Sequence, residues 1–160
     1  NAVGDKGLLL LAESPNLSQL EYLNLENAGI TALGILALSQ SPHLSRLKEL
    51  NLSGNDLREK GLLILAESGN FKNLVKLRIS GVPVGDSGFL ALVHSNTLSQ
   101  LEELEAMGNT ITRKSLDSMT TASKLARLKK LDLRRNKLKE ADLIFLADTP
   151  KFQALETLRF

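Results

Sequence analysis

Leucine recurs in this chain at a fixed interval of 27 residues from one end to the other. One column contains Leu20, Leu47, Leu74, Leu101, Leu128 and Leu155, and a second contains Leu23, Leu50, Leu77, Leu104, Leu131 and Leu158. Three further columns, which start at Val3, Leu17 and Leu25, are apolar in every copy. A constant period without insertions is the signature of a protein built from stacked supersecondary units.

Each unit contains the phrase L-x-x-L-x-L, as in LEYLNL at 20–25 and LKELNL at 47–52. The alternation of leucine with polar residues predicts a short strand with one buried face. A turn follows, and then a helical sequence such as KGLLLLAES at 6–14 or KGLLILAES at 60–68, after which Pro or Gly ends the helix. The unit is therefore strand, turn, helix and return loop.

The units must stack, because a helix this short is marginal alone in water and each unit exposes leucines to the next. The strands then form a parallel sheet, and the helices, which are wider than the ~4.8 Å strand spacing, form a second layer. This mismatch predicts an α/β solenoid: a curved right-handed arc with the sheet on its concave face and short helices on its convex face. The 160 residues form a single domain, 1–160, with about five full repeats and partial repeats at both ends.

The two ends of the chain lie inside repeats. The last apolar strand stops at Phe160, and no polar cap is recognisable. Solenoids need such caps, and an open strand edge invites pairing. We therefore expect a fragment of a longer array, or an end covered by something else. We also expect a monomer. Any end-to-end contact between copies would use the open C-terminal strand.

On these residues the whole chain resembles leucine-rich-repeat proteins. The family motif L-x-x-L-x-L-x-x-N-x-L appears as LKELNLSGNDL at 47–57 and LKKLDLRRNKL at 128–138. The repeats look most like those of the ribonuclease-inhibitor-like subclass, in a bacterial style. The resemblance implies a ladder of asparagines that bond the turn backbone. Ala28 and Val82 stand in the asparagine column, so we expect two interruptions and a different arrangement in the GVPVG turn at 81–85.

Composition excludes several classes of function. There is no Cys, which excludes disulfides and thiolate metal sites, and no apolar run approaches the ~20 residues that span a bilayer. The formal net charge of +2 gives no overall attraction to nucleic acid or membranes. We expect no cofactor, metal, nucleic acid, small-molecule substrate or membrane insertion. The expected location is cytoplasmic, or inside a host cell after secretion if the chain is an effector.

Side chains suited to catalysis do not gather. His43 and His94 lie at different columns two repeats apart, with no metal-binding spacing near either. The carboxylates of Glu102, Glu103 and Glu105 could suggest acid–base work, but the strand pattern places two of them on an exposed face with no enclosing pocket. The chain is therefore predicted not to be an enzyme.

The fourth repeat departs from the pattern. Ala106 replaces a larger core residue, and Asp117 stands in a column that is leucine in the four preceding copies. Because burying an aspartate is costly, this favours a loosely packed repeat. The alternative is a polar patch on the convex side that is left for a contact.

The outward strand columns differ between copies, so they carry the functional information. One column alternates in sign through Glu49, Lys76, Glu103 and Lys130, which become cross-strand neighbours in a parallel stack. The middle of the face could therefore simply neutralise itself. The N-terminal end is different, because it is polar with a single aromatic anchor, Tyr22, of a type favoured in interfaces.

A basic run covers residues 124–139, with eight Lys and Arg residues against one Asp and a local net charge of +7. Its first lysines face glutamates one strand away, whereas Arg134 and Arg135 are expected to have no such partner. Met107 lies beside Arg134 in the next strand. A solvated basic edge and an edge that docks an acidic partner both fit this pattern.

We predict a non-catalytic scaffold that binds a partner protein on its concave face. The residues predicted to bind are Tyr22, Asn24, Glu26, Arg78, Met107, Arg134 and Arg135. The alternative, implied by the resemblance alone, is the substrate-selecting repeat domain of a bacterial effector that is associated with ubiquitin ligases or regulates GTPases. Nucleic-acid binding through the basic run is disfavoured, because the face has one aromatic residue and many carboxylates.

Overall fold

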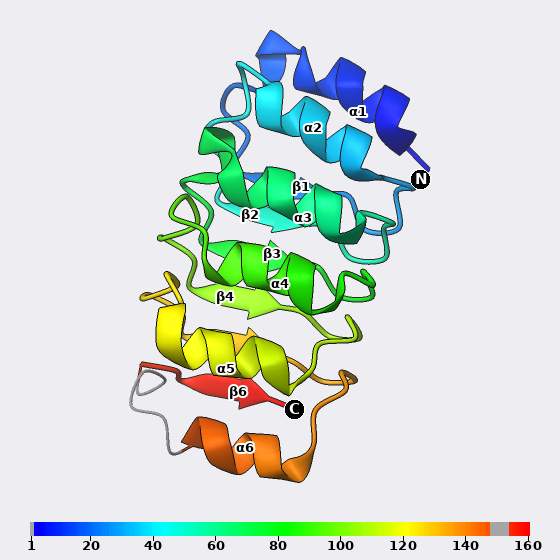
Figure 1. Ribbon diagram of the computed structural model, residues 1–160. Helices are drawn as coiled ribbons and strands as arrows, with labels where there is room; N and C mark the ends of the chain where they lie inside the picture. The colour runs from blue at the N-terminus through cyan, green and yellow to red at the C-terminus, as the bar shows by residue number, and fades with distance from the viewer. Residues whose placement is uncertain (1, 148–153) are drawn as a thin grey trace.

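The structure, a computed structural model, describes residues 2–147 and 154–160. In these residues six helices alternate with six strands (Figure 1). The helices are α1 Gly4–Ala12, α2 Ala32–Gln40, α3 Arg58–Glu67, α4 Gly85–Val93, α5 Arg113–Ala122 and α6 Glu140–Ala147. The strands are β1 Tyr22–Asn24, β2 Glu49–Asn51, β3 Lys76–Arg78, β4 Glu103–Glu105, β5 Lys130–Asp132 and β6 Thr157–Arg159. Two short 3₁₀ helices, η1 Pro15–Leu17 and η2 Gly69–Phe71, lie in return loops.

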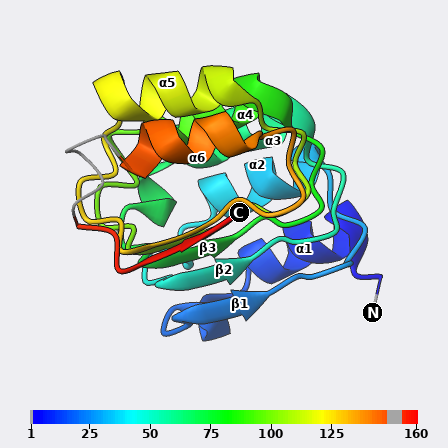
Figure 2. The same ribbon diagram turned by 90° about the horizontal axis from the view of Figure 1, so that it is seen from below.

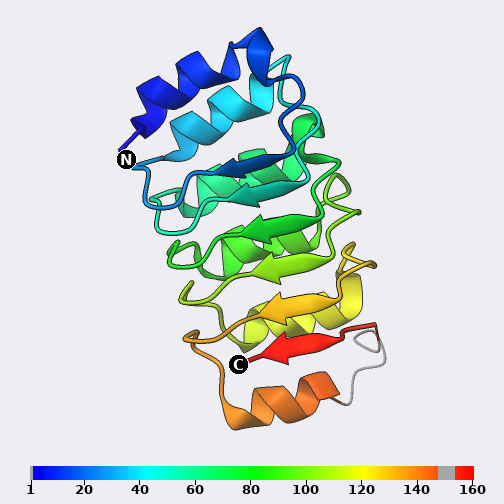
Figure 3. The same ribbon diagram turned by 180° about the vertical axis from the view of Figure 1, so that it is seen from behind.

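The strands form one parallel sheet in chain order, seen in front of the helices in Figure 3. Every pair keeps the same register, so that Leu23 pairs with Leu50 and Leu131 with Leu158. The row of helices spreads over a greater length than the row of strands, because packed helices need about 8–10 Å each and strands only ~4.8 Å (Figure 3). The sheet therefore lines the inner side of the arc, and the predicted α/β solenoid is confirmed.

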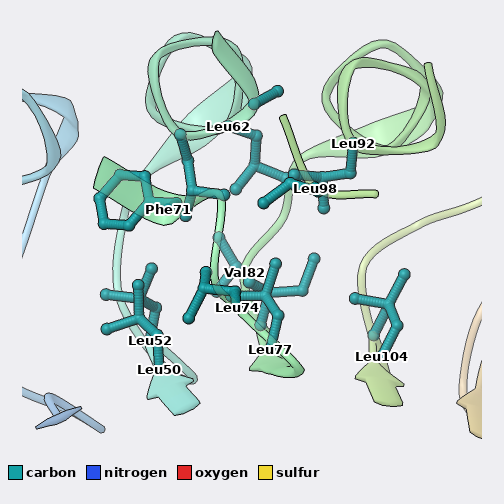
Figure 4. Packing of buried hydrophobic residues seen from close by; sticks show 14 of the residues in the cluster. Leu50, Leu52, Leu62, Phe71, Leu74, Leu77, Val82, Leu92, Leu98 and Leu104 are labelled. Carbon is teal, nitrogen blue, oxygen red and sulfur yellow. The ribbon is translucent and has the colours of Figure 1, made fainter. Parts of the chain in front are cut away.

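Figure 2, turned by 90°, shows the sheet and the helices as separate layers, and the buried apolar side chains lie between them. Leu50, Leu77 and Leu104 point from the strands toward Leu62 and Leu92 of the helices, and all five are buried (Figure 4). Each fully buried leucine contributes roughly 1.5–3 kcal/mol relative to an exposed one. The same packing solution is repeated in successive units, which explains why the inward columns hardly vary.

Two helices begin with the same threonine cap. The hydroxyls of Thr31 and Thr112 each accept a hydrogen bond from the backbone two residues later. Each threonine also donates its N–H and O–H to a carboxylate of the preceding helix, Asp5 or Asp86, at 2.6 to 2.9 Å. Burial acts to raise the pKa of Asp86, but hydrogen bonds from Ser115 and Thr112 outweigh it and lower that pKa. Consecutive helices are thus linked by charge-assisted hydrogen bonds.

Glycine allows the helices to approach closely. A Cβ added to Gly61 would lie 2.8 Å from the Cβ of Leu57 and 3.6 Å from the Cα of Ala32 in α2. A Cβ at Gly88, in the same column, would lie 3.4 Å from the Cα of Glu59 in α3. The overlap that excludes a side chain is thus with the residue four positions earlier, Leu57 or Val84 at 2.8 Å, while the neighbouring helix lies at ordinary contact distance.

Asn55 joins two consecutive turns. Its Nδ2 donates to the carbonyls of Leu25 and Leu52, each at 2.8 Å. Its Oδ1 accepts from the backbone N–H groups of Ala28 and Ile30 at 3.1 and 2.9 Å. The side chain thus satisfies buried backbone groups in its own repeat and in the preceding one.

The GVPVG turn is satisfied differently, as the sequence predicted. Asn109 accepts from the N–H of Val82 at 2.9 Å, but its Nδ2 has no partner among the described residues. The N–H of Val84, which would correspond to that of Ile30, turns back to the carbonyl of Val82 at 2.7 Å. The local turn therefore replaces one rung of the ladder.

A column of serines follows the helices and ties the return loops together. The hydroxyl of Ser41 donates to the carbonyl of Ala12, near the end of α1, and the hydroxyl of Ser95 donates to the carbonyl of Ala66, near the end of α3. Ser68 makes an equivalent bond. Serine recurs at this spacing in the sequence, but only the structure identifies the acceptor.

The expectation that Asp117 loosens the fourth repeat by burial is wrong. Its column faces solvent, and Asp117 accepts from Nε of Arg113 at 2.7 Å. Arg113 also lies 3.0 Å from Asp142, and its guanidinium stands 3.7 Å above the ring of Phe145. Polar and cation–π contacts therefore connect α5 with α6.

Candidate protein-binding face

The outward strand residues form straight rows across the sheet. The first row contains Tyr22, Glu49, Lys76, Glu103, Lys130 and Thr157, and the second contains Asn24, Asn51, Arg78, Glu105, Asp132 and Arg159. The other predicted binding residues, Glu26, Met107, Arg134 and Arg135, follow the ends of β1, β4 and β5. The seven predicted residues therefore lie along one face of the sheet, but in separate groups.

Ion pairs cover the middle of this face. Nζ of Lys76 lies 2.5 Å from Glu103 and 3.6 Å from Glu105, and Nζ of Lys130 lies 2.6 Å from Glu103. Arg78 bonds Glu105 at 3.1 Å. Hydrogen bonds from Lys130 and Lys76 lower the pKa of Glu103, and the bond to Glu103 raises the pKa of Lys130. The middle of the face neutralises itself, and Arg78 belongs to this network.

An open hollow of about 230 Å³ lies on this network, between β3 and β6. Glu103, Glu105, Lys130 and Asp132 line it, and because it is open to solvent it does not enclose these glutamates. A general acid needs a carboxyl whose pKa is raised toward neutrality. Here basic partners lower the pKa of Glu103 and of Asp132 instead, which suits binding of charged side chains better than proton transfer.

Tyr22 leads the N-terminal group and is 49% exposed. Beside it, Oδ1 of Asn24 accepts from the backbone N–H of Glu26 at 3.0 Å. The carboxylate of Glu26 accepts in turn from Nδ2 of Asn51 at 3.1 Å. These bonds hold the polar neighbours in place and leave the aromatic ring accessible.

Arg134 has a partner, contrary to the sequence prediction. Its Nη2 donates to Oδ2 of Asp132 at 2.6 Å and its Nε to Oδ1 at 2.9 Å. This hydrogen bonding is the main reason that the pKa of Asp132 is lowered. The partner lies two residues earlier in the same chain segment, and not one strand away, which is why the pattern of facing strands did not reveal it.

Arg135 has a strained backbone and an exposed side chain. Its φ is +57°, and the equivalent positions of the three preceding repeats are Gly54, Gly81 and Gly108, all with positive φ. A left-handed conformation costs a residue with a Cβ roughly 1–2 kcal/mol. Within the described part of the chain, Arg135 forms no ion pair. A charged residue held at such a position is a candidate for function.

Much of the basic run is neutralised by its neighbours. Nζ of Lys129 lies 2.8 Å from Glu102, and Arg127 lies 3.5 Å from the same carboxylate. The hydrogen bond from Lys129 lowers the pKa of Glu102. Among the described residues, the members of the run that form no ion pair are Lys124, Arg135, Lys137 and Lys139, and Arg135 follows directly on the end of β5.

Chemistry of other kinds finds little support in the described ranges, 2–147 and 154–160. No cluster of three His, Cys, Asp or Glu side chains in them could hold a metal ion. His94 lies on the convex side, with its Nε2 2.7 Å from the hydroxyl of Ser118. None of the helices described is long and apolar enough to cross a membrane.

Comparison with known proteins relates the chain to leucine-rich repeats. A sequence profile described as "Leucine Rich repeat" matches residues 43–66, which include β2 and most of α3. No curated protein sequence matches the chain significantly. The fold is similar to that of the tropomodulin C-terminal domain of Caenorhabditis elegans, with a TM-score of 0.55 and 12% identity over 98% of this chain and 81% of that one. It is also similar to an internalin from Listeria monocytogenes, with a TM-score of 0.50 and 19% identity over 95% of this chain.

The chain covers only 50% of that internalin. At these levels of identity the two structures support only the fold, and the profile match supports the assignment of a leucine-rich repeat at residues 43–66. Together with the six-stranded parallel sheet and its backing helices, they show an α/β solenoid with the leucine-rich-repeat fold, in which residues 43–66 match a leucine-rich-repeat profile.

Proposed function

We propose that the chain is a non-catalytic scaffold that binds a partner protein on the concave face of its sheet. Leucine-rich-repeat domains generally mediate protein–protein interaction. The observation that carries the proposal is Arg135, an exposed arginine kept in a left-handed turn where three preceding repeats have glycine. The left-handed backbone of Arg135 costs stability, and no ion pair of its side chain offsets that cost within the described residues. Selection for a contact with a partner would explain why the arginine is kept.

Two anchors define the extent of the interface. Tyr22 lies on β1 and Arg135 follows β5, so four strand spacings, or ~19 Å, separate them. An interface of ordinary size, about 800 Å² on each partner, covers both. The ion pairs between the anchors are partly exposed and contribute about 1 kcal/mol or less each, so their main effect is on orientation.

The partner is expected to be acidic where it meets Arg135, because the guanidinium can form a bidentate pair with a carboxylate. The affinity should then fall as the ionic strength rises. The role of a substrate-selecting domain in a bacterial effector stays a prediction that rests on the family resemblance.

Substitution of the two anchors tests the proposal. A partner captured on the immobilised chain would be titrated by calorimetry against wild type, Tyr22→Ala and Arg135→Gly. We expect Tyr22→Ala to weaken binding by about 30-fold, the effect of losing ~2 kcal/mol at a hot spot. Arg135→Gly should weaken binding about 10-fold, the loss of an Arg–carboxylate contact of roughly 1.5 kcal/mol, while the free energy of unfolding rises because glycine relaxes the turn.

Arg58→Gly is the matched control. Arg58 is also an exposed arginine with positive φ, +52°, but it opens α3 and bonds Asp56. Its replacement should change stability without changing affinity. An affinity that is unaltered in the double variant Tyr22→Ala, Arg135→Gly contradicts the proposal.

A further inference from the structure

A row of leucines on the convex side faces solvent. Leu9 of α1, Leu36 of α2 and Leu63 of α3 are 50%, 38% and 41% exposed, and they occupy the same position in consecutive repeats. Leu33, next to them in α2, is 65% exposed. The same helices already bury other leucines, so the exposed row is not needed for the core. A contiguous exposed apolar surface usually marks a contact site.

Two hollows lie along this row at equivalent places. One is between α1 and α2, has a volume of about 260 Å³, and is lined by Leu9, Ala12 and Ala37, with polar residues at its edge. The other is between α3 and α4 and has a volume of about 450 Å³. Its apolar lining residues are the counterparts two repeats later, Leu63, Ala66 and Ala91, and its polar side is formed by Glu67, His94, Ser95, Asn96 and Thr97. The hollows therefore form a pair in which corresponding residues recur.

One lining column differs between the repeats with a hollow and the repeat without one. It contains Ala37, Ile64 and Ala91 in consecutive repeats, so a small residue leaves space beside α2 and α4, while isoleucine occupies the equivalent place on α3. Neighbouring helices pack about 8–10 Å apart, which places the two hollows roughly 16–20 Å from each other. An α-helix rises 1.5 Å per residue, so side chains about eleven positions apart, on the same face after three turns, span this distance.

Charges flank the leucine row in a consistent order. Lys6, Lys60 and Lys114 lie on one side, near the first turns of α1, α3 and α5, and Glu13 and Glu67 lie on the other, at the ends of α1 and α3. None of the five forms an ion pair in the part of the chain that the structure describes.

The helix dipole favours acidic residues at the start of a helix and basic residues at its end, and Asp5 and Glu59 in the first turns of α1 and α3 follow that rule. Asp5 is engaged by Thr31 of the next helix. Lys6, Lys60, Glu13 and Glu67 are in the opposite order to the dipole, and a ligand with the complementary order of charges would pair them.

We propose that the convex face of α1 to α4 binds an amphipathic helix of a partner protein, laid across the row of leucines. Two apolar side chains about eleven residues apart enter the two hollows. Acidic residues run along the flank of that helix that faces Lys6 and Lys60, and basic residues run along the flank that faces Glu13 and Glu67. This contact is separate from the one proposed for the sheet.

A displayed library of helical peptides tests the proposal. Peptides of about 25 residues would be selected on the immobilised chain, with apolar positions eleven residues apart fixed and flanking positions randomised between acidic and basic residues. We expect enriched peptides to carry acidic residues on one flank and basic residues on the other. A peptide in which the two flanks are exchanged should bind at least 5-fold more weakly.

Filling the hollows is the decisive variant. Ala37→Ile with Ala91→Ile copies the residue that α3 has in the same column and should weaken an enriched peptide at least 10-fold. Lys6→Glu with Lys60→Glu changes only exposed side chains, so it keeps the test valid if the first variant folds poorly, and it should reverse the preferred flank. The sheet variant Tyr22→Ala, Arg135→Gly should bind the same peptide within 2-fold of wild type.

Three results would overturn the proposal. One is a selection that yields no peptide sensitive to the hollow-filling variant, and another is a set of enriched peptides without opposite flanks. The third is self-association of the chain in sedimentation that disappears when the hollows are filled, because a second copy would then be the occupant. None of these results bears on the sheet, since binding there depends on Tyr22 and Arg135.

Discussion

Two asparagines in the same column differ in the number of hydrogen bonds that their side-chain amides form. Asn55 bonds buried backbone groups on both sides of its amide, whereas Asn109 accepts from Val82 and leaves its Nδ2 without a partner among the described residues. The difference arises in the preceding turn, where Pro83 lies between two valines and Val84 bonds within the turn. Identical residues in identical columns therefore need not stabilise the fold equally.

Alanine substitution at both positions measures this difference. Asn55→Ala leaves four buried backbone groups without their partner and should lower the free energy of unfolding by about 2–4 kcal/mol. Asn109→Ala removes one satisfied bond and should cost about 1 kcal/mol. Urea unfolding followed by circular dichroism would give both values. Equal losses would show that the Nδ2 of Asn109 is bonded in solution.

The sequence could predict residue roles only where the 27-residue column decides them. It correctly placed Tyr22 on the sheet face and Leu50 in the core. It missed the bond between Arg134 and Asp132, because the reach of a long side chain along its own segment is not a property of the column. The left-handed backbone at Arg135 was visible in principle, since glycine occupies that column in the three preceding repeats.

Glycines at the same helix position differ in what a side chain would meet. Glycine normally destabilises a helix by about 1 kcal/mol relative to alanine, yet Gly61 is placed where a Cβ would press on Leu57 and approach the backbone of α2. Gly7 has the same position in α1, where only the side chain of Val3 lies near. The two positions therefore separate intrinsic helix propensity from the local overlap with the Cβ of Leu57.

Gly61→Ala should destabilise the chain by about 1–3 kcal/mol, because the Cβ of Leu57 cannot rotate away, so the start of α3 must shift, and this cost outweighs the gain in propensity. Gly7→Ala should be neutral or stabilising by up to ~1 kcal/mol, since the neighbouring Val3 side chain can rotate away. Thermal or urea unfolding of both variants would decide. A stabilised Gly61→Ala variant would mean that Leu57 lies farther from Gly61 than described.

At this scale the sequence predicted the elements but not all of their faces. Predicted helices at 6–14 and 60–68 correspond to α1 and α3, which begin two residues earlier. Leucine at positions 9 and 63 predicts a buried column, in which Asp117 would be costly. The structure places this column on the solvent side. Leucine normally indicates a core position. When a helix is apolar on two faces, the sequence pattern does not show which face is buried.

Acidic side chains across the whole arc depend on basic or hydrogen-bonding partners. The carboxylates with lowered pKa are Glu21, Asp86, Glu102, Glu103, Asp132 and Asp142. In the unfolded chain these groups return to about 4.5 for Glu and 3.8 for Asp. The folded chain therefore binds fewer protons than the unfolded chain in this range, and their contribution to stability is present above it.

We expect the free energy of unfolding to fall as the pH decreases from about 5 through the lowered pKa values, because protonation removes the charged form that the folded state favours. Urea unfolding between pH 7 and pH 3 would measure the decline. Asp86→Asn removes one contributing group and should make the decline shallower. A profile with the same slope in wild type and Asp86→Asn would contradict the role assigned to that carboxylate.

The unbroken register between repeats also bears on how such a molecule can change over evolutionary time. Each unit offers the next the same apolar columns, so the loss or duplication of one whole unit would rejoin without a mismatch at the junction. Such an event would bring Tyr22 and Arg135 closer together or farther apart by one strand spacing, ~4.8 Å, and leave the local surroundings of both residues intact. Gain or loss of repeats would therefore change the length of the binding surface in steps of one strand spacing, whereas point substitutions would change its side-chain chemistry.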